Sequence, residues 1–212
     1  GELTCPWYTV ITDFYAHPLW LNEFCSQYFV AAPATRQGLL ALQVPSKKIK
    51  ITGIPLRQQF LKTYNHQAVC QKYGLNPDWP VILALSGGFG LGDLAKVVKL
   101  LASLTLPAQI VAVAGNNKKL EKRLLKIKLD IENQATVLGL PRTKPKVLVR
   151  GEVANMAELM SVARLAVTKA GGVTISECLA LGLPMIITAP IPGQEKTNSQ
   201  FLLKHQAAKV LA

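Results

Sequence analysis

The chain has little charge and no long apolar run. Charged residues make up 17% of its 212 residues, below the ~25% usual for soluble domains, whereas 50% are hydrophobic. No window approaches ~18 uninterrupted apolar residues, so a membrane-spanning helix is not expected. The opening GELTCPWYTV lacks the basic start and the cleavage site of a signal peptide, so none is expected either. Because half of the residues are apolar, the chain can bury a sizeable core, and wholesale disorder is excluded.

Metal-ligand and disulfide patterns are also missing. The four cysteines are far apart in the sequence and form no CxxC pair. That spacing fits neither a zinc site nor a compact disulfide framework, and no pair of carboxylates has metal-ligand spacing. We therefore expect no metal and no cofactor, and we expect reduced, buried thiols as in cytosolic proteins. The cysteines are Cys5, Cys25, Cys70 and Cys178.

Acidic residues are scarce: 12 stand against 24 lysines and arginines, which gives a net charge of +12. One basic tract begins at residue 118 and continues to residue 150, and a second, from Arg36 to Lys62, contains no acidic residue. Such a surface suits an anionic partner, either a lipid leaflet, a nucleic acid or a phosphorylated substrate; a solvated face without a partner is the alternative. A nucleic-acid binder would interleave aromatic residues, and residues 117–150 contain none, so we expect no nucleic acid.

Short apolar runs alternate with amphipathic segments along the chain. Continuous apolar strands alternating with helices are typical of parallel sheets covered on both faces, so the predicted fold class is α/β. The expected strands are residues 7–12, 27–31, 48–52, 80–86, 108–115, 146–151, 165–170 and 184–188. The expected helices are residues 18–23, 34–42, 91–104, 117–130, 155–162 and 173–181.

Residues 54–80 interrupt this alternation with a polar, helix-prone segment that ends in NPDWP. We therefore expect one α/β unit in residues 1–55, a linker in 56–78 and a second α/β unit in 79–212. The first unit has three strands, which make a thin parallel sheet on their own. The last residues, AAKVLA, are typical of a strand that is just starting. The chain is thus expected to be an excerpt of a larger two-domain protein.

A glycine-rich turn, SGGFG, lies between an expected strand and an expected helix. The first N–H groups of a helix are unpaired and the helix dipole is positive there, so such a turn can bind phosphate. The P-loop pattern fails because Asp93 stands where lysine is required, and the dinucleotide pattern GxGxxG fails at the same residue. Both a plain turn and an anion site stay open for Ser86, Gly87, Gly88 and Gly90.

The stretch VTKAGGVTISE offers a second phosphate-binding turn. Lys169 ends an expected strand, and Gly171 and Gly172 lead into an expected helix. Glu177, in or near the first helical turn, can accept hydrogen bonds from the vicinal hydroxyls of a ribose; an acid favoured by the helix dipole is the alternative. After the next strand, PIPGQEKTN presents amide and carboxylate groups suited to sugar hydroxyls. Diphosphate, ribose and hexose together indicate a nucleotide sugar bound at the carboxyl ends of the strands.

These motifs together resemble those of GT-B glycosyltransferases of family 28. KAGGVTISE, GLPMI and PGQEKTN are similar to the donor-binding signature of that family. YTVITDFYAHPLWL, YFVAAPATRQGL and ITGIPLRQQF resemble the end of the first domain in its diacylglycerol glucosyltransferases and monogalactosyldiacylglycerol synthases. The resemblance spans essentially the whole chain. It implies a GT-B fold: a Rossmann-like donor domain with a parallel sheet, preceded by the C-terminal part of a second Rossmann-like domain.

The resemblance also implies roles for individual residues. The residues expected to bind the donor lie at strand ends and in the turns that follow. They are Ser86, Gly87, Gly88 and Gly90 at the diphosphate; Glu152 and Val153 at the uracil; Lys169, Gly171, Gly172, Val173 and Thr174 at the phosphates; Glu177 at the ribose; and Gln194, Glu195 and Asn198 at the hexose. Asp13 and His17 are expected on the acceptor side as catalytic residues, with a structural role for His17 as the alternative. His66 and His205 are expected to be structural.

The implied reaction transfers a hexose from UDP-glucose or UDP-galactose to a diacylglycerol, with inversion at the anomeric carbon. A general base would take the acceptor proton, and helix N-termini would hold the departing UDP without a metal. The basic surface would attract anionic lipid and place the protein in the cytoplasm, at the membrane periphery. Alternatives are an inactive UDP-sugar-binding fragment, a lipid I type N-acetylglucosaminyltransferase and a sugar epimerase. The sequence departs from the family pattern in lacking what precedes YTVITDF and in placing Arg164 where an aspartate is frequent.

Overall fold

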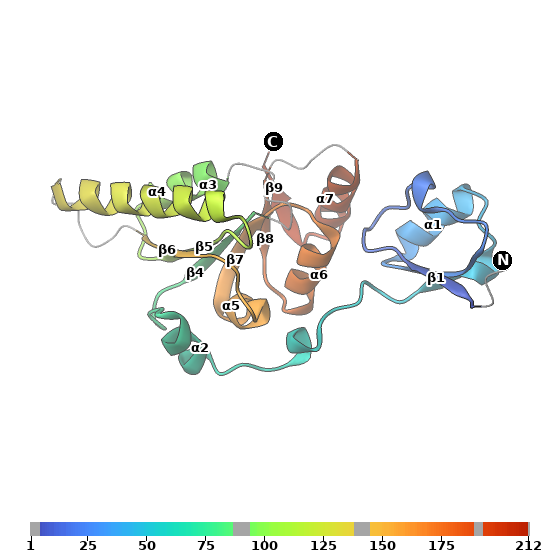
Figure 1. Ribbon diagram of the computed structural model, residues 1–212, viewed down its shortest axis with the longest axis horizontal. Coiled ribbons are helices and arrows are strands. Elements are labelled where there is room, and N and C mark those ends of the chain that lie inside the picture. The colour runs from blue at the N-terminus through green and yellow to red at the C-terminus, as the bar shows by residue number, and fades with distance from the viewer. Residues whose placement is uncertain (1–4, 87–93, 138–144, 189–192, 212) are drawn as a thin grey trace.

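Two parallel sheets joined by a long connection make up the protein (Figure 1). The computed structural model describes residues 5–86, 94–137, 145–188 and 193–211. Within these ranges three strands form the first sheet and six form the second. The α/β fold class predicted from the sequence is confirmed.

The first sheet has the order β1-β2-β3, and its strands are all parallel. The strands are β1 (Trp7–Val10), β2 (Cys25–Val30) and β3 (Ile49–Ile51). Helix α1 (Pro33–Ala41) connects β2 to β3, and single 3-10 turns form η1 (Pro18–Trp20) and η2 (Ser46–Lys48). A small core around Tyr28, Val30 and Leu39 holds α1 on the sheet.

The connection between the sheets packs against the second one. It contains η3 (Gln58–Leu61) and α2 (His66–Tyr73), which pass below the second sheet in Figure 1. Phe60, Val69 and Cys70 are buried in the same core cluster as the second sheet. This segment is therefore fixed in place by apolar burial over much of its length.

A shared carboxylate holds α2 on helix α5 (Met156–Val162). The Tyr73 hydroxyl donates a hydrogen bond of 2.7 Å to Glu158 Oε2, and Lys72 Nζ lies 2.6 Å from the same oxygen. The hydrogen bonds from Lys72 and Tyr73 hold the pKa of the Glu158 carboxyl below its usual range. Burial, together with this carboxylate, raises the pKa of Tyr73. Near neutral pH the Glu158 carboxyl is therefore ionised, and Tyr73 keeps the hydroxyl proton that it donates.

The second sheet has the order β6-β5-β4-β7-β8-β9 and is parallel throughout. Its strands are β4 (Val81–Leu85), β5 (Gln109–Val113), β6 (Lys146–Arg150), β7 (Ala163–Thr168), β8 (Met185–Ile187) and β9 (Ala208–Val210). The chain first builds outward from β4 to β6 and then returns to β7 on the other side of β4. In open α/β sheets, ligands bind at the carboxyl ends of the strands where the strand order reverses in this way.

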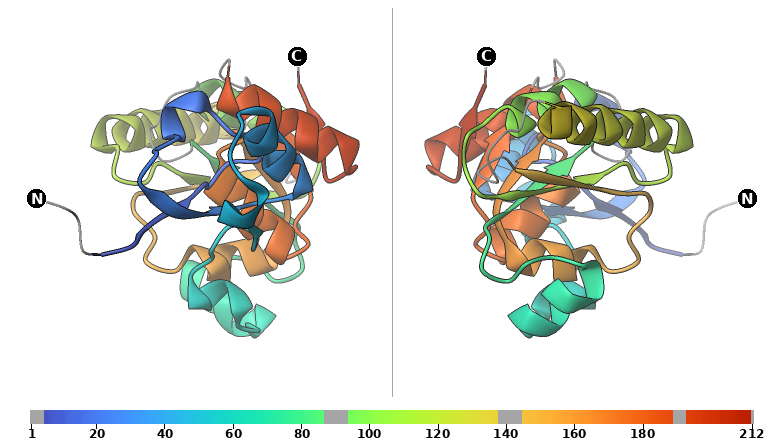
Figure 2. Two further views of the ribbon diagram at one scale, coloured as in Figure 1. Left: turned by 90° about the vertical axis from the view of Figure 1, so that its right-hand side faces the viewer. Right: turned by 90° about the vertical axis from the view of Figure 1, so that its left-hand side faces the viewer.

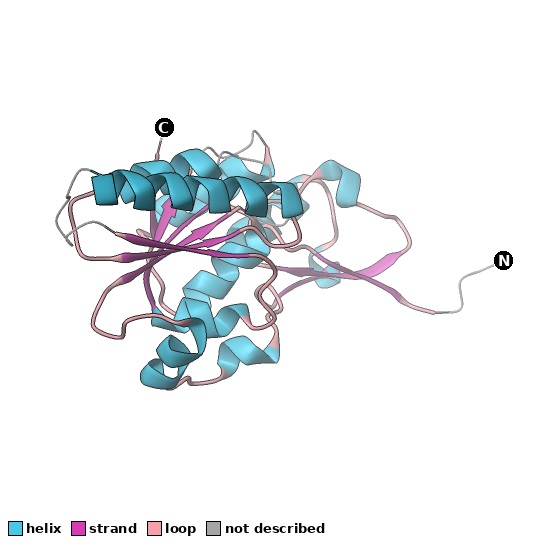
Figure 3. Ribbon diagram, turned by 60° about the vertical axis from the view of Figure 1, so that its left-hand side comes forward, coloured by secondary structure: helices cyan, strands magenta, loops and turns pink. Residues whose placement is uncertain are grey.

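Helices cover both faces of the second sheet (Figures 1 and 3). Besides α5 they are α3 (Leu94–Ala102), α4 (Lys118–Val137), α6 (Gly172–Ala180) and α7 (Gln194–Lys204). Buried residues of α3 and α4 join one core cluster, whereas those of α5, α6 and α7 join another. Because both faces are covered, every residue of β4 and β5 is buried.

The expected strands and most of the expected helices are confirmed. PIPGQEKTN was expected to be a loop because of its prolines and glycine; this is wrong from Gln194 onward, where helix α7 begins. Two further expectations about helices and one about the cysteines are corrected. The helix expected over residues 18–23 is only the turn η1, because Leu21 is already extended. α4 continues to Val137 instead of ending near residue 130, since neither glycine nor proline interrupts the sequence there. Cys5 is exposed, so the expectation of four buried thiols is wrong at that residue, which lies before the first strand and has no sheet to cover it.

Candidate functional site

The carboxyl ends of β4, β7 and β8 bring the expected donor-binding groups to one edge of the second sheet. β4 pairs with β7 so that Ala84 lies opposite Val167; continued by two residues, this register places Ser86 beside Lys169. Gly87, Gly88 and Gly90 lie outside the described residues, and so do the prolines of the PIPGQEKTN loop. The role of the first glycine turn therefore stays a prediction.

Lys169 is a nearly buried cation at this edge. Only 8% of the residue is exposed, although it carries an ammonium group. Among the described residues, none accepts a hydrogen bond from that group. A buried charge without a partner is costly, and it becomes favourable when an anion occupies the adjacent space. The side chain is thus placed to neutralise a bound anion.

Helix α6 starts three residues after Lys169, and its first amides are open. Gly171, the residue before the helix, has no side chain to cap it, and nothing lies within 4 Å of where its Cβ would be. No side chain caps the N–H groups at the helix start, so those near Val173 and Thr174 can donate to an anion. Together with Lys169 they form a setting for phosphate oxygens.

Glu177 lies at the start of the second turn of α6, close to the first turn as expected. Helical periodicity places it on the same side as Val173 and Thr174. Its carboxylate is half-buried, and burial raises its pKa, while the nearby Arg57 lowers it in part. A half-buried carboxylate on the side of the helix that carries the open amides can accept hydrogen bonds from ligand hydroxyls.

The segment expected at the uracil follows strand β6. Glu152 is exposed, and Val153 is half-buried against the main core cluster. β5 separates β6 from β4, so these residues share the carboxyl edge but lie further along it. The Arg150 guanidinium at the end of β6 donates to the Tyr73 carbonyl at 2.6 Å and is thereby turned toward α2.

Helix α7 begins with Gln194 and Glu195, which are exposed and half-buried, respectively. Asn198, one turn further, is fully buried with a relative exposure of 0%. Its expected role at the hexose stays a prediction, and within the fold its side chain has another role.

Asn198 joins the two sheets. Its Oδ1 accepts a hydrogen bond from the Phe14 amide at 2.8 Å, and its Nδ2 donates to Asp13 Oδ1 at 2.7 Å and to the Ala170 carbonyl at 2.9 Å. The Phe14 ring stacks on the Phe201 ring of α7 with centroids 4.0 Å apart. The amide of one side chain thus fixes the first unit against the edge of the second sheet.

Gly172 belongs to the same contact. A Cβ on this residue would overlap the Thr12 carbonyl oxygen and would lie 3.0 Å from Asp13 Oδ1. The glycine is therefore required by the close approach of the first unit. From the sequence, Gly172 was expected only as part of a phosphate-binding turn. The sole sequence signal for its contact with the first unit was that two glycines, Gly171 and Gly172, stand next to each other.

The expected acceptor-side residues separate in the structure. Asp13 lines a cavity of about 310 Å³ together with Trp20 and residues 9–12. His17 does not line it; its Nδ1 accepts a hydrogen bond of 3.1 Å from the Leu19 amide and caps η1. The structure thus gives His17 the structural role that was left open as the alternative, and its catalytic role stays a prediction.

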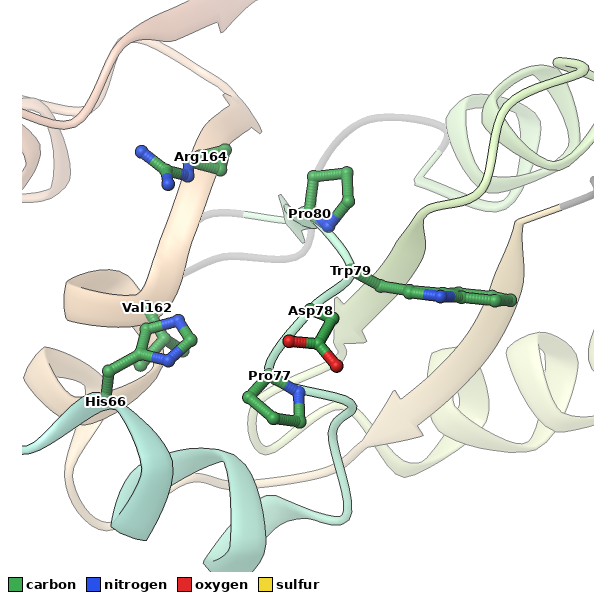
Figure 4. Close-up of a pocket in the computed structure, with 7 residues that line it drawn as sticks. All are labelled: His66, Pro77, Asp78, Trp79, Pro80, Val162 and Arg164. Carbon is green, nitrogen blue, oxygen red and sulfur yellow. The ribbon is translucent and has the colours of Figure 1, made fainter.

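A second cavity, of about 430 Å³, lies at the opposite edge of the sheet (Figure 4). It is lined by His66, Pro77, Asp78, Trp79, Pro80, Val162 and Arg164, around the amino ends of β4 and β7. In Figure 4 the side chains of Arg164 and Trp79 extend in opposite directions, away from the shared space. Because its polar groups do not converge and no expected site residue lines it, this cavity is not the candidate donor site.

The described part of the chain has neither a cluster of metal ligands nor a membrane-spanning helix. Over the described ranges, no three histidine, cysteine, aspartate or glutamate side chains gather as metal ligands would. Within the same part of the chain, no helix combines the length and the apolar character needed to cross a bilayer.

Solved structures define the class of the fold. MurG of Acinetobacter baumannii is 18% identical with a TM-score of 0.59, over 98% of this chain and 53% of that chain. HepE of Anabaena, crystallised with UDP and glucose, is 17% identical with a TM-score of 0.52, over 87% of this chain and 53% of that chain. These likenesses define the protein as one with the GT-B glycosyltransferase fold.

Sequence comparison then names the family. Residues 96–212 match the glycosyltransferase family 28 C-terminal domain, so the chain belongs to that family, and residues 2–56 match monogalactosyldiacylglycerol (MGDG) synthase. The processive diacylglycerol beta-glucosyltransferase of Bacillus licheniformis is 34% identical over 97% of this chain, and that of Bacillus subtilis is 33% identical over the same share. The chain spans 51% of the length of these two relatives. The resemblance seen in the sequence motifs is confirmed.

Proposed function

We propose that this protein is a UDP-sugar-dependent hexosyltransferase that transfers glucose or galactose to a diacylglycerol. Support comes from the two family matches and from relatives named diacylglycerol glucosyltransferases. HepE, a fold relative, was crystallised with UDP and glucose. The protein works in the cytoplasm at the membrane periphery and needs no metal or further cofactor.

Lys169 carries the donor-site proposal. The residue is 8% exposed and lies at the edge where helix α6 begins, and no described residue accepts a hydrogen bond from its ammonium group. A diphosphate supplies the missing negative charge and accepts hydrogen bonds from the helix start. The diphosphate of a UDP-sugar is the anion expected for a glycosyltransferase of family 28.

The remaining donor contacts follow from this placement. Gly171, Gly172, Val173 and Thr174 offer backbone amides, with Ser86, Gly87, Gly88 and Gly90 on the neighbouring turn. Glu177 accepts hydrogen bonds from the ribose, residues 152–153 border the uracil, and Gln194 and Glu195 contact the hexose. Asn198 stays a predicted hexose contact, although its side chain is buried in this structure.

The chemistry is an inverting displacement. The acceptor hydroxyl oxygen forms a bond to the anomeric carbon while the bond from that carbon to the diphosphate oxygen breaks. Asp13 takes the hydroxyl proton: Asn198 holds its Oδ1 at 2.7 Å, and in the described part of the chain no hydrogen bond occupies its second oxygen. Lys169 and the α6 amides stabilise the charge that develops on the leaving UDP.

Titration calorimetry with UDP, UDP-glucose and UDP-galactose tests the donor site. Lys169→Met should weaken UDP binding more than tenfold, since it removes the charge that faces the phosphates. Lys196→Met, at an exposed lysine of α7, is the matched control and should bind as the wild type. Equal affinity of the two variants, with both folded, would place the diphosphate elsewhere.

Turnover is tested separately. Radiolabelled UDP-glucose or UDP-galactose with diacylglycerol vesicles should give a glycolipid, and Asp13→Asn should abolish it while UDP still binds. Incorporation only from UDP-N-acetylglucosamine into lipid I would favour the alternative transferase. Tight UDP binding with no product from any acceptor would support a UDP-sugar-binding module without activity.

A further inference from the structure

Helices α3 and α4 lie side by side over one face of the second sheet (Figures 1 and 2). Their inner sides supply buried residues to a shared core cluster, among them Val98, Leu120, Leu124 and Ile127. This packing accounts for the apolar residues expected of helices that cover a sheet. It leaves the outer sides of both helices facing away from the protein.

The outer sides nevertheless carry leucines. Leu100 of α3 is 60% exposed, and Leu125 and Leu129 of α4 are 43% and 57% exposed. Leu125 and Leu129 are four residues apart, so they are neighbours on the helix surface, on the side opposite the buried Leu120 and Ile127. A helix that only covers a sheet would have polar residues at these positions.

Lysines surround these leucines. α3 and α4 together hold eight lysines and arginines against three acidic residues. Two of the acids are paired on the helix itself, Glu121 with Lys118 at 3.1 Å and Glu132 with Lys128 at 3.7 Å.

Three further lysines of α4 are left without an acidic partner among the described residues. They are Lys119, Lys122 and Lys126. By helical spacing, Lys122 is next to Leu125 and Lys126 is next to Leu129. The outer side of α4 is therefore apolar and cationic over the same few turns.

We propose that this leucine and lysine surface, formed by the outer sides of α3 and α4, docks onto an anionic lipid bilayer. The proposal rests on the proposed function, because a diacylglycerol acceptor stays in the membrane. The charge complements acidic headgroups, and the leucines can enter the boundary between headgroups and acyl chains. A nucleic acid would need no leucines and would favour aromatic residues, which neither helix contains.

The mode of docking follows from the packing. Because the inner side of each helix is fixed on the sheet, only the outer side chains reach the bilayer. The leucines enter shallowly, while lysine ammonium groups stay at the depth of the lipid phosphates. Binding should therefore be reversible and should weaken as salt screens the lysines.

Vesicle sedimentation tests the surface with the 212-residue chain. Vesicles of equal parts phosphatidylcholine and phosphatidylglycerol should bind the protein, and vesicles of phosphatidylcholine alone should bind it much less. Lys122→Gln/Lys126→Gln should weaken binding to the mixed vesicles about 25-fold, since each well-placed lysine is worth about fivefold. Leu125→Ala/Leu129→Ala should weaken it about tenfold without loss of helix propensity.

Matched controls use exposed residues elsewhere. Leu179→Ala/Leu203→Ala and Lys204→Gln/Lys209→Gln change the same residue types outside α3, α4 and the two basic tracts and should bind as the wild type. Binding that is equal in the α4 variants and the wild type would overturn the proposal. Leu19 and Phe24 are the most exposed large apolar residues of the first unit. If only their replacement by alanine reduced vesicle binding, the membrane contact would lie on the first unit and the proposal would be wrong.

The failure of this inference can be told from failure of the proposed function. All four double variants should bind UDP with wild-type affinity and keep the wild-type circular dichroism, because the substituted residues are outside the donor site. Vesicle binding without any UDP binding would refute the donor site and leave the surface standing. UDP binding with no preference for anionic vesicles would refute the surface and leave the donor site standing.

Discussion

The two sheets are built alike and buried differently. Every residue of β4 and β5 in the second sheet is buried, whereas in β1 of the first sheet Trp7 is 47% exposed and Tyr8 is 55% exposed. Both sheets are parallel, but helices cover the second on both faces, and β1 lies at the edge of the first with little against it. The difference teaches that an apolar strand pattern reports a strand, while burial depends on what is packed over it.

The two units also differ in how they depend on each other. The second has large core clusters of its own, whereas the first has a small one and meets the second at Asn198, Gly172 and Phe201. If this contact fixes the first unit, changes at the contact should matter more than changes inside the second unit.

Gly172→Ala should have the largest effect. The added Cβ overlaps the Thr12 carbonyl, so the variant should lose about 3 kcal/mol of unfolding free energy or let the units part. Urea unfolding measures the first outcome, and an increased radius of gyration in X-ray scattering measures the second. Gly171→Ala is the control for stability, since nothing lies within 4 Å of its Cβ. Equal stability of both variants and the wild type would show that the contact does not form in solution.

Asn198→Leu should cost about 2 kcal/mol, because the Phe14 amide and the Ala170 carbonyl lose their partners while buried. Asn198→Asp keeps the shape but puts a carboxylate against Asp13. Repulsion raises the folded-state pKa of this pair, so the folded state binds more protons and the variant should regain stability as pH falls. Urea unfolding at neutral and acidic pH checks both variants. A flat pH response of Asn198→Asp relative to the wild type would contradict the contact.

Glu177 of α6 lies in the electrostatic field of Arg57 in the connection, and its raised pKa predicts a pH-dependent ligand affinity. Burial raises the pKa of Glu177, so its carboxylate is lost at higher pH than that of an exposed glutamate. UDP affinity should therefore fall as pH drops from neutral, by about tenfold if the ribose loses one charge-assisted hydrogen bond.

Calorimetry across pH separates the contributions to this effect. Glu177→Gln should remove that part of the pH dependence, and Arg57→Gln should move the loss to higher pH, because the cation that lowers the pKa is gone. An unchanged pH profile in both variants would count against Glu177 at the ribose.

Tyr73→Phe should have the smallest effect, about 1 kcal/mol, since it removes one hydrogen bond between α2 and Glu158 within the second unit. The lowered pKa of Glu158 contributes stability that is present above its unfolded-state pKa and is lost as pH falls through the folded-state value. The variant should show less of this acid-side loss in urea unfolding. The radius of gyration should not change, in contrast to Gly172→Ala.

Much of the architecture could be predicted from the sequence. Alternating apolar strands and helices indicated each β-strand, because a fully covered parallel strand is apolar on both sides. The groups at the ends of β7 and β8 could be predicted as well, since parallel strands bring their carboxyl ends to one edge. Lys169 was expected at this edge. Its near-complete burial gives a physical reason for anion binding, because a bound anion would stabilise the buried cation.

Other roles could not be read from the residues alone. Asn198 stands in a polar stretch that suits a sugar, and only the packing of α7 against the first unit turns it inward. His17 likewise looked like a catalytic residue beside Asp13, yet it caps η1. Local sequence does not determine which distant segment of the chain will form hydrogen bonds with a given polar side chain.

By itself, the sequence determined the α/β class, the strands, the turn at Gly171 and Gly172 and the basic tracts, because these depend on local periodicity and composition. The tertiary structure alone decided that Gly172 and Asn198 join the two units and that α3 and α4 turn leucines and lysines to the same outer side. These outcomes depend on which surfaces meet across the fold, and burial and close approach between distant residues are set only when the whole chain packs.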